Sequence, residues 1–126
     1  MKRTLVEVYA LAVCFVTLVC FVIAMGIGIY DLITIANPEF TMSSYAYERH
    51  QSNEAFSRDW PKEKPLPAGE ELTKLREESY KAALRSEKRD GVQSLTRVMI
   101  IVSIDIVVFA IHWLIGRKAR SIPAIS

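Results

Sequence analysis

The chain has 126 residues, a length that suits one small domain, and 51% of them are hydrophobic. Its formal net charge is only +2, and the basic residues do not gather as they do on a nucleic-acid-binding face, so no nucleic-acid partner is expected. The apolar residues form two blocks with a charged segment between them. This distribution predicts an all-α membrane protein, a two-transmembrane-helix hairpin with an extramembrane, partly helical loop.

The first apolar block predicts a transmembrane helix over residues 5–36. From Val8 to Tyr30 the chain carries no charge, and these roughly 23 residues give about 34 Å of helix, enough to cross a hydrocarbon core of about 30 Å. The alternative is a cleaved signal peptide. We expect the helix to be retained, because the run is longer than a signal h-region and passes through Gly26 and Gly28 into Ile29, Tyr30 and Asp31 without a convincing cleavage site. Asn37-Pro38 should end it, since the residue before a proline disfavours the helical conformation.

Residues 37–67 are predicted to form an aromatic-rich interfacial segment followed by a proline-rich spacer. A short helix is expected from Thr41 to Phe56, with Ser43 or Ser44 as its N-cap. Amphipathic rings concentrate at membrane surfaces, so the aromatic residues favour a segment that lies there; rings that stack on a ligand are the alternative. The aromatic residues are Phe40, Tyr45, Tyr47, Phe56 and Trp60.

Residues 68–96 are predicted to form a charged amphipathic helix. Glu70 and Glu71 favour its N-terminus, and Glu70 precedes Lys74 by four residues, the spacing of a stabilising pair. Its apolar stripe is thin, so the helix should be solvated and pack on one neighbour. Gly91 either ends the helix or lies within one that continues into the second apolar block, since one glycine costs only about 1 kcal/mol.

The second transmembrane helix is predicted over residues 97–117, with a basic C-terminal tail over residues 118–126. The run from Val98 to Gly116 has about 19 residues, or roughly 28 Å of helix, just enough to span. Trp113 lies near its end, where an indole ring suits the headgroup region.

Basic residues flanking the two spans predict the orientation. Five of them flank the two apolar runs near the termini, and cytoplasmic flanks carry an excess of Lys and Arg, so both termini are expected in the cytoplasm and the loop outside. These are Lys2, Arg3, Arg117, Lys118 and Arg120. A second group, which precedes the second span, acts in the opposite direction: Arg85, Lys88, Arg89 and Arg97.

Asp105 and His112 form an intramembrane polar pair within the second predicted span. They are seven residues apart, nearly two full turns, so they share one side of the helix. A carboxylate at this depth costs about 2.5–3.5 kcal/mol on insertion scales, so it should face protein or water. It either holds helices together as a hydrogen-bonded neutral acid or belongs to a proton or cation pathway.

Small residues on one stripe of the first span predict a helix-packing face, which comprises Ala10, Cys14, Thr17, Ala24 and Gly28. If the spans pair as antiparallel neighbours, Asp105 lies near Thr17 and Phe21. The same register suggests ion pairs between Asp31 and Arg97, and between Glu7 and Arg117 or Arg120.

No motif in the sequence predicts catalysis. It contains no phosphate-binding glycine loop, nucleophile elbow or CxxC pair. We therefore expect no enzyme activity, no catalytic, cofactor-binding or metal site, no cofactor and no small-molecule substrate. The expected partners are the lipid bilayer and either another membrane protein or further copies of this chain, which suits an accessory, assembly or interaction subunit. An oligomeric proton or cation pathway using Asp105 and His112 is the alternative.

The first half of the chain resembles one group of membrane proteins. The block from Val8 through Gly28-Ile-Tyr-Asp, the Asn37-Pro38 break and the run Ser43-Ser-Tyr-Ala-Tyr-Glu-Arg-His-Gln carry the resemblance. It is to small bacterial inner-membrane proteins grouped as domains of unknown function. The resemblance implies a location in a bacterial inner membrane. It implies nothing about activity.

Overall fold

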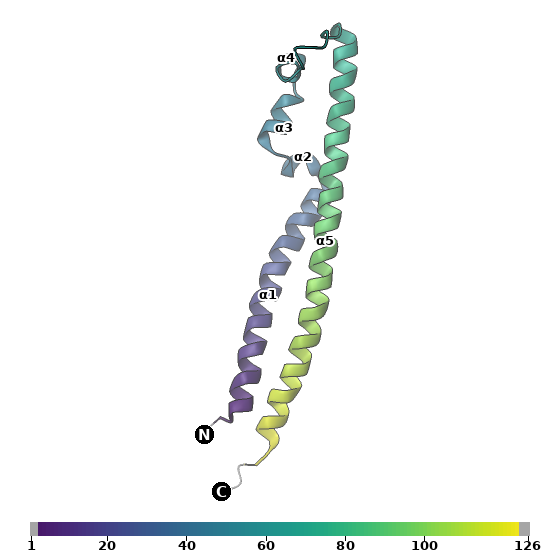
Figure 1. Ribbon diagram of the computed structural model, residues 1–126. Coiled ribbons are helices and arrows are strands. Elements are labelled where there is room, and N and C mark those ends of the chain that lie inside the picture. Colours follow the sequence, from purple (N-terminus) through teal and green to yellow (C-terminus); the bar gives the residue numbers. More distant parts are fainter. Residues whose placement is uncertain (1–2, 124–126) are drawn as a thin grey trace. The chain divides into compact units, whose positions relative to one another are not determined.

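The computed structural model describes residues 3–123, and this part of the chain is all-helical, as the sequence predicts. Its elements are α1 (Leu5–Ala36), α2 (Pro38–Thr41), α3 (Ser44–Arg49), α4 (Asn53–Ser57) and α5 (Gly69–Ser121) (Figure 1). They divide into two compact units: unit 1 comprises residues 1–29 and 94–126, and unit 2 comprises residues 30–93. Lys2 and residues 124–126 of the predicted basic tail lie outside the described residues.

Helix α1 ends where the Asn37-Pro38 step makes a further helical residue unfavourable. Ala36 is its last residue, and Pro38 then occupies the first turn of α2, where a missing backbone N–H costs nothing. The first backbone N–H groups of a helix have no partner within it, so proline suits this position.

The short helix expected between Thr41 and Phe56 is instead divided in two. The Ser43 hydroxyl accepts a hydrogen bond from the Ala46 N–H and caps α3, and the Ser52 hydroxyl does the same with the Ala55 N–H to cap α4. Each serine satisfies a helix N-terminus, so the second cap starts a new helix rather than extending the first. The segment from Pro61 begins with a turn closed by the Lys64 N–H on the Pro61 carbonyl.

Helix α5 is continuous through Gly91 and joins the two helices predicted over residues 68–96 and 97–117. Glu70 and Glu71 lie in its first turn and Lys118 and Arg120 in its last, each favourable for the helix dipole. The uninterrupted hydrogen-bond ladder therefore outweighs the small propensity cost of one glycine.

Within the described residues, α1 and α5 each contain a stretch long and apolar enough to cross a membrane. The best 18-residue windows have mean hydropathies of 2.8 in α1 and 2.5 in α5. Only 22% of the α1 window and 6% of the α5 window is buried. A core helix of a soluble protein buries most of such a stretch, which these two do not.

In unit 1, the two helical segments meet along a narrow seam. On α1 the buried positions are Glu7, Ala10, Cys14, Thr17, Ala24 and Gly28. Together with the half-buried Phe21, they are spaced alternately by three and four residues. On α5 the buried or half-buried positions with the same spacing are Val98, Val102, Asp105, Phe109, His112, Gly116 and Ala119. A repeat of about 3.5 residues is the spacing by which two helices keep one seam in contact.

The small residues of this seam let the helices approach closely. A Cβ atom added to Gly116 would lie 3.4 Å from the Cβ of Ala10, and one added to Gly28 would lie 3.4 Å from Cγ1 of Val98. Ala10 thus meets the end of α5 and Gly28 meets residues near Val98, so the contacts follow opposite orders along the two segments (Figure 1).

In unit 2, Gly91 marks the tightest approach of α5 to the end of α1. A Cβ atom added to Gly91 would lie 2.9 Å from Cγ2 and 3.1 Å from Cβ of Thr34, and 3.2 Å from Cγ1 of Ile35. Thr34 is buried, and its hydroxyl donates to the Tyr30 carbonyl. Its β-branched side chain is held close to the backbone, so it cannot move aside by itself.

Alanine substitutions at Gly91 and Gly26 test this close approach. Gly91→Ala should lower the thermal midpoint of the full chain in detergent micelles, measured by far-ultraviolet circular dichroism, with a cost of about 1–3 kcal/mol from overpacking. Gly26→Ala is the matched control, because a Cβ there meets nothing within 4 Å. Alanine at that position should leave the free energy of unfolding unchanged or raise it by up to about 1 kcal/mol.

A second substitution identifies the clashing atom. Thr34→Ser removes Cγ2 but keeps the hydroxyl, so it should restore part of the stability lost in the Gly91→Ala chain. Equal stability of the two alanine chains would contradict the close approach at Gly91.

Candidate functional site: a carboxyl group in an apolar pocket

Asp105 lies in a pocket between the two helical segments of unit 1. The cavity has a volume of about 200 Å³, and α1 and α5 each contribute three of its residues. They are Thr17, Leu18 and Phe21 from α1 and Asp105, Ile106 and Phe109 from α5. Apart from Thr17 and Asp105, the lining side chains are apolar.

The Asp105 carboxyl group is incompletely satisfied in this setting. Its Oδ2 atom is buried and has no hydrogen-bond partner among the described residues. Thr17, the partner suggested by the sequence, uses its hydroxyl to donate to the Cys14 carbonyl at 2.9 Å. A helical threonine readily bonds back to its own preceding turn, so its hydroxyl proton is not available to Asp105. The pocket therefore contains a buried carboxyl oxygen without a hydrogen-bond partner.

His112 shares the seam with Asp105 but has separate partners. Its Nδ1 lies 2.8 Å from the Val108 carbonyl and therefore donates, because a carbonyl oxygen only accepts. Its ring lies 5.7 Å from the Tyr9 ring on α1, centroid to centroid. Seven residues of helix separate it from Asp105 by about 10 Å along the axis, so the pair is not in direct contact.

The predicted helix-packing face lies on the seam. All five of its residues are buried in unit 1, namely Ala10, Cys14, Thr17, Ala24 and Gly28. The Cys14 thiol lies 3.9 Å from the Phe109 carbonyl and is placed to donate to it. Cys14 therefore contacts the backbone one turn from Asp105.

The two suggested ion pairs differ in outcome. Oε1 of Glu7 lies 3.5 Å from Nε of Arg120, whereas Arg117 makes no ion pair within residues 3–123. Of the two arginines that the sequence offers Glu7, the structure places Arg120 beside it. Asp31 belongs to unit 2 and Arg97 to unit 1, so their pairing stays a prediction.

In unit 2, His50 joins α3 to α5, a role that sequence reasoning missed. Its Nδ1 bonds to the Ala46 carbonyl and its Nε2 lies 2.9 Å from the Ser79 hydroxyl of α5. Its ring lies 5.5 Å from Tyr80 and 6.0 Å from Phe56, centroid to centroid. Both nitrogens are engaged, so the imidazole acts as a buried structural group.

The aromatic residues of the segment 37–67 consequently have different roles. Phe56 is buried and contacts His50 and Trp60, so it is not available to a membrane surface. Phe40 is 77% exposed and Tyr45 is 66% exposed. Phe56 therefore packs within unit 2, whereas the interfacial position of the segment as a whole stays a prediction.

A polar cluster on the surface of unit 2 consists of Tyr45, Arg49 and Asp59. The Tyr45 hydroxyl donates to Oδ2 of Asp59, and Nε of Arg49 lies 3.5 Å from the same oxygen. The hydrogen bond to Asp59 raises the pKa of Tyr45 above its ordinary value of 10.0, because ionisation would destroy the bond. Burial and the nearby Glu39 carboxylate likewise raise the pKa of Tyr80.

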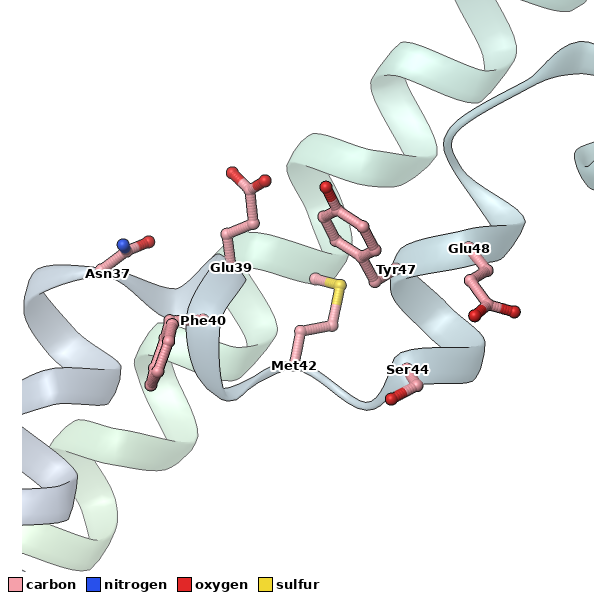
Figure 2. Close-up of a pocket in the computed structure, with 7 residues that line it drawn as sticks. All are labelled: Asn37, Glu39, Phe40, Met42, Ser44, Tyr47 and Glu48. Atoms are coloured by element: carbon pink, nitrogen blue, oxygen red, sulfur yellow. The ribbon is translucent and has the colours of Figure 1, made fainter.

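Unit 2 also contains a larger hollow, of about 390 Å³, beside α2 and α3 (Figure 2). Its lining residues are Asn37, Glu39, Phe40, Met42, Ser44, Tyr47 and Glu48. Figure 2 shows the carboxylates of Glu39 and Glu48 pointing in opposite directions, so they do not converge on one ligand position. Within residues 3–123, no group of three or more His, Cys, Asp or Glu side chains is placed to hold a metal ion.

No family model, curated protein or solved structure matches the chain.

The raised pKa of Tyr45 can be tested by removing the Asp59 charge. In the Asp59→Asn chain, the Tyr45 pKa should fall toward 10.0, measured from phenolate absorbance as the difference between chains with Tyr45 and with Tyr45→Phe. The folded pKa is raised, so the contribution of this bond to stability is present below pH 10.0 and lost as the pH rises through the folded value.

Glu54→Gln is the matched control for this titration. Glu54 pairs with Arg58 at 3.9 Å rather than with Tyr45, so its loss should leave the Tyr45 pKa unchanged. An unchanged Tyr45 pKa in the Asp59→Asn chain would contradict the hydrogen bond.

Proposed function

We propose that this chain is an integral membrane protein that acts as a non-enzymatic accessory, assembly or interaction subunit of a membrane complex. Its two apolar segments would span the bilayer as a helical hairpin. The observation that carries the proposal is the buried, unpartnered Oδ2 atom of Asp105 in an apolar pocket. Its partners would be the bilayer and either another membrane protein or further copies of this chain.

Exposure of the apolar side chains supports the membrane location. The faces of α1 and α5 away from the seam carry large exposed hydrophobic residues along both spans. Soluble monomers rarely expose apolar areas of this extent, since contact with water is unfavourable. Lipid tails provide an apolar environment that covers these faces without a protein core.

Helix length supports the same conclusion. The 32 residues of α1 correspond to about 48 Å, more than the hydrocarbon core of about 30 Å requires. All its backbone groups between the ends bond within the helix, as a lipid environment demands.

Asp105 supports the interaction role. A carboxyl oxygen in an apolar environment that lacks a donor raises the free energy of the isolated chain. The Thr17 hydroxyl proton is committed to the Cys14 carbonyl, so water or another polypeptide would supply a hydrogen-bond partner for Oδ2. A donor from a neighbouring transmembrane helix would satisfy the oxygen and join the two chains, as polar residues do between membrane helices.

The alternative is a proton or cation pathway, which the same unpartnered oxygen favours. An ionisable group in mid-span is a common component of such pathways. The roughly 10 Å between Asp105 and His112, and the commitment of Nδ1 of His112 to the Val108 carbonyl, make a direct transfer between them unfavourable. The interaction role needs no such transfer, and we prefer it.

Reporter fusions test the topology. The basic flanks favour cytoplasmic termini in a bacterial inner membrane, so a reporter at Ser126 and one within the Pro61–Pro67 spacer should report opposite sides. Finding both reporters on the same side would remove one of the two spans from the proposal.

Substitutions at Asp105 test the interaction role. Asp105→Leu cannot bond to a partner and should weaken assembly in mild detergent by about 3- to 20-fold, which corresponds to about 0.6–1.7 kcal/mol for such bonds. Asp105→Asn retains a donor and an acceptor and should assemble almost normally. The measurement is the amount of complex that survives affinity purification of the full chain.

Ser103→Leu is the matched control. Ser103 is exposed, two residues from Asp105, and its hydroxyl bonds back to the Met99 carbonyl of its own helix. Its loss should leave assembly intact. The proton-pathway alternative predicts the reverse pattern: normal assembly of the Asp105→Leu chain, with proton uptake into liposomes lost in both Asp105 variants.

A further inference from the structure

The last turns of α5, in unit 1, form another hollow, which the interaction role does not use. Its volume is about 410 Å³, and its lining residues are Trp113, Arg117, Arg120 and Ser121. From Trp113, Arg117 is four residues away and Arg120 is seven, so all three side chains share one face of the helix. The hollow therefore combines an indole ring with two guanidinium groups.

Two of these side chains are held in place by neighbours. Nε of Arg120 lies 3.5 Å from Oε1 of Glu7, and its guanidinium carbon lies 5.8 Å from the centre of the Trp113 ring. The Trp113 ring in turn stacks on Phe109 at 6.0 Å, with 13° between the ring planes. The Glu7 contact uses only one edge of the Arg120 fork, because guanidinium has five N–H donors. The remaining donors are oriented and available.

Arg117 supplies the uncompensated charge. It is exposed, and it makes no ion pair within residues 3–123. The charge of Arg120 is balanced by Glu7, so the hollow retains one net positive charge. Ser121 contributes little as a donor, because its hydroxyl bonds to the Lys118 carbonyl. The ligand chemistry that fits is a single anionic group with several acceptor oxygens beside an apolar body.

We propose that this hollow binds the headgroup of an anionic phospholipid, with the phosphodiester between Arg117 and Arg120 and the indole of Trp113 beside the glycerol region. Planar guanidinium forks match phosphate oxygens, and indole rings favour the headgroup level. Trp113 belongs to the apolar run and the arginines follow it, so the hollow lies where a bilayer changes from hydrocarbon to headgroup. This inference rests on the proposed membrane location.

A lipid fits this site better than free phosphate. The hollow has an aromatic wall, and Trp113 continues into the exposed apolar face of α5. An amphiphile matches both parts, whereas inorganic phosphate would leave the ring and the apolar face without a partner.

Lys118 provides a charge-matched comparison on the other side of the helix. It follows Arg117 directly, carries the same charge and is exposed, but it lines a separate, apolar groove of about 500 Å³. Replacing either residue by glutamine removes one positive charge from the same turn. Only the Arg117 change alters the hollow.

The experiment measures which lipid occupies the neighbourhood of Trp113. The full chain with Trp60→Phe retains a single tryptophan, and the change removes an indole N–H that is buried without a partner. It is reconstituted into phosphatidylcholine vesicles with a minority of phosphatidylglycerol. Brominated acyl chains, which quench tryptophan fluorescence, are placed on one lipid or the other at fixed composition.

The expected result is an enrichment of phosphatidylglycerol beside Trp113 of about five-fold, since one Lys or Arg contributes about that preference near an anionic surface. Arg117→Gln should abolish most of this enrichment, and Lys118→Gln should preserve it. Inorganic phosphate added at constant ionic strength should not displace the lipid.

Three outcomes would overturn the inference. They are retention of the enrichment in the Arg117→Gln chain, an equal loss in both glutamine variants, and displacement by inorganic phosphate. The absence of quenching by either brominated lipid would show instead that Trp113 lies outside the bilayer. That result would remove the proposed membrane location, and it differs from a loss of lipid preference.

Discussion

The close approach of two helices along a narrow line of small side chains is the constraint on which unit 1 depends. Alanine, cysteine and glycine at the α1 seam bring the backbones near enough for contacts such as that of Cys14 with the Phe109 carbonyl. Such a line buries little surface, so most of each apolar face remains outside it. The exposed apolar faces that result favour the proposed lipid or protein environment.

Polar groups on the seam would determine which residues face one another. Here Glu7 lies beside Arg120 and Tyr9 beside His112, and a shifted register would break both contacts. A polar residue at a seam position is a well-attested way to specify register in paired helices. Asp105, which lacks an internal partner, would extend this specification to a neighbouring chain.

The sequence predicted what depends on neighbouring residues and missed what depends on distant ones. The end of α1 at Asn37-Pro38, the Ser43 cap and the stripe from Ala10 to Gly28 follow from local sterics, capping and helical periodicity. The burial of Phe56 depends on its contact with His50, whose ring meets Ser79 and Tyr80 of α5. No local pattern brings together residues about 30 positions apart. The sequence also could not predict that Oδ2 of Asp105 lacks a partner. That depends on which acceptor the Thr17 hydroxyl, on the other helix, uses.

The narrow seam also has an evolutionary consequence. At exposed positions such as Val16, Ile23 and Ile104, which lipid would cover in the proposed membrane location, side chains of different shape would be nearly equivalent, because fluid acyl chains adapt to each. At Ala10 and Gly28, by contrast, each added carbon separates two backbones. Neutral drift would therefore randomise most of the two spans while selection held a few small residues. Lineages of this fold would share a spacing of small residues long after their remaining letters had diverged.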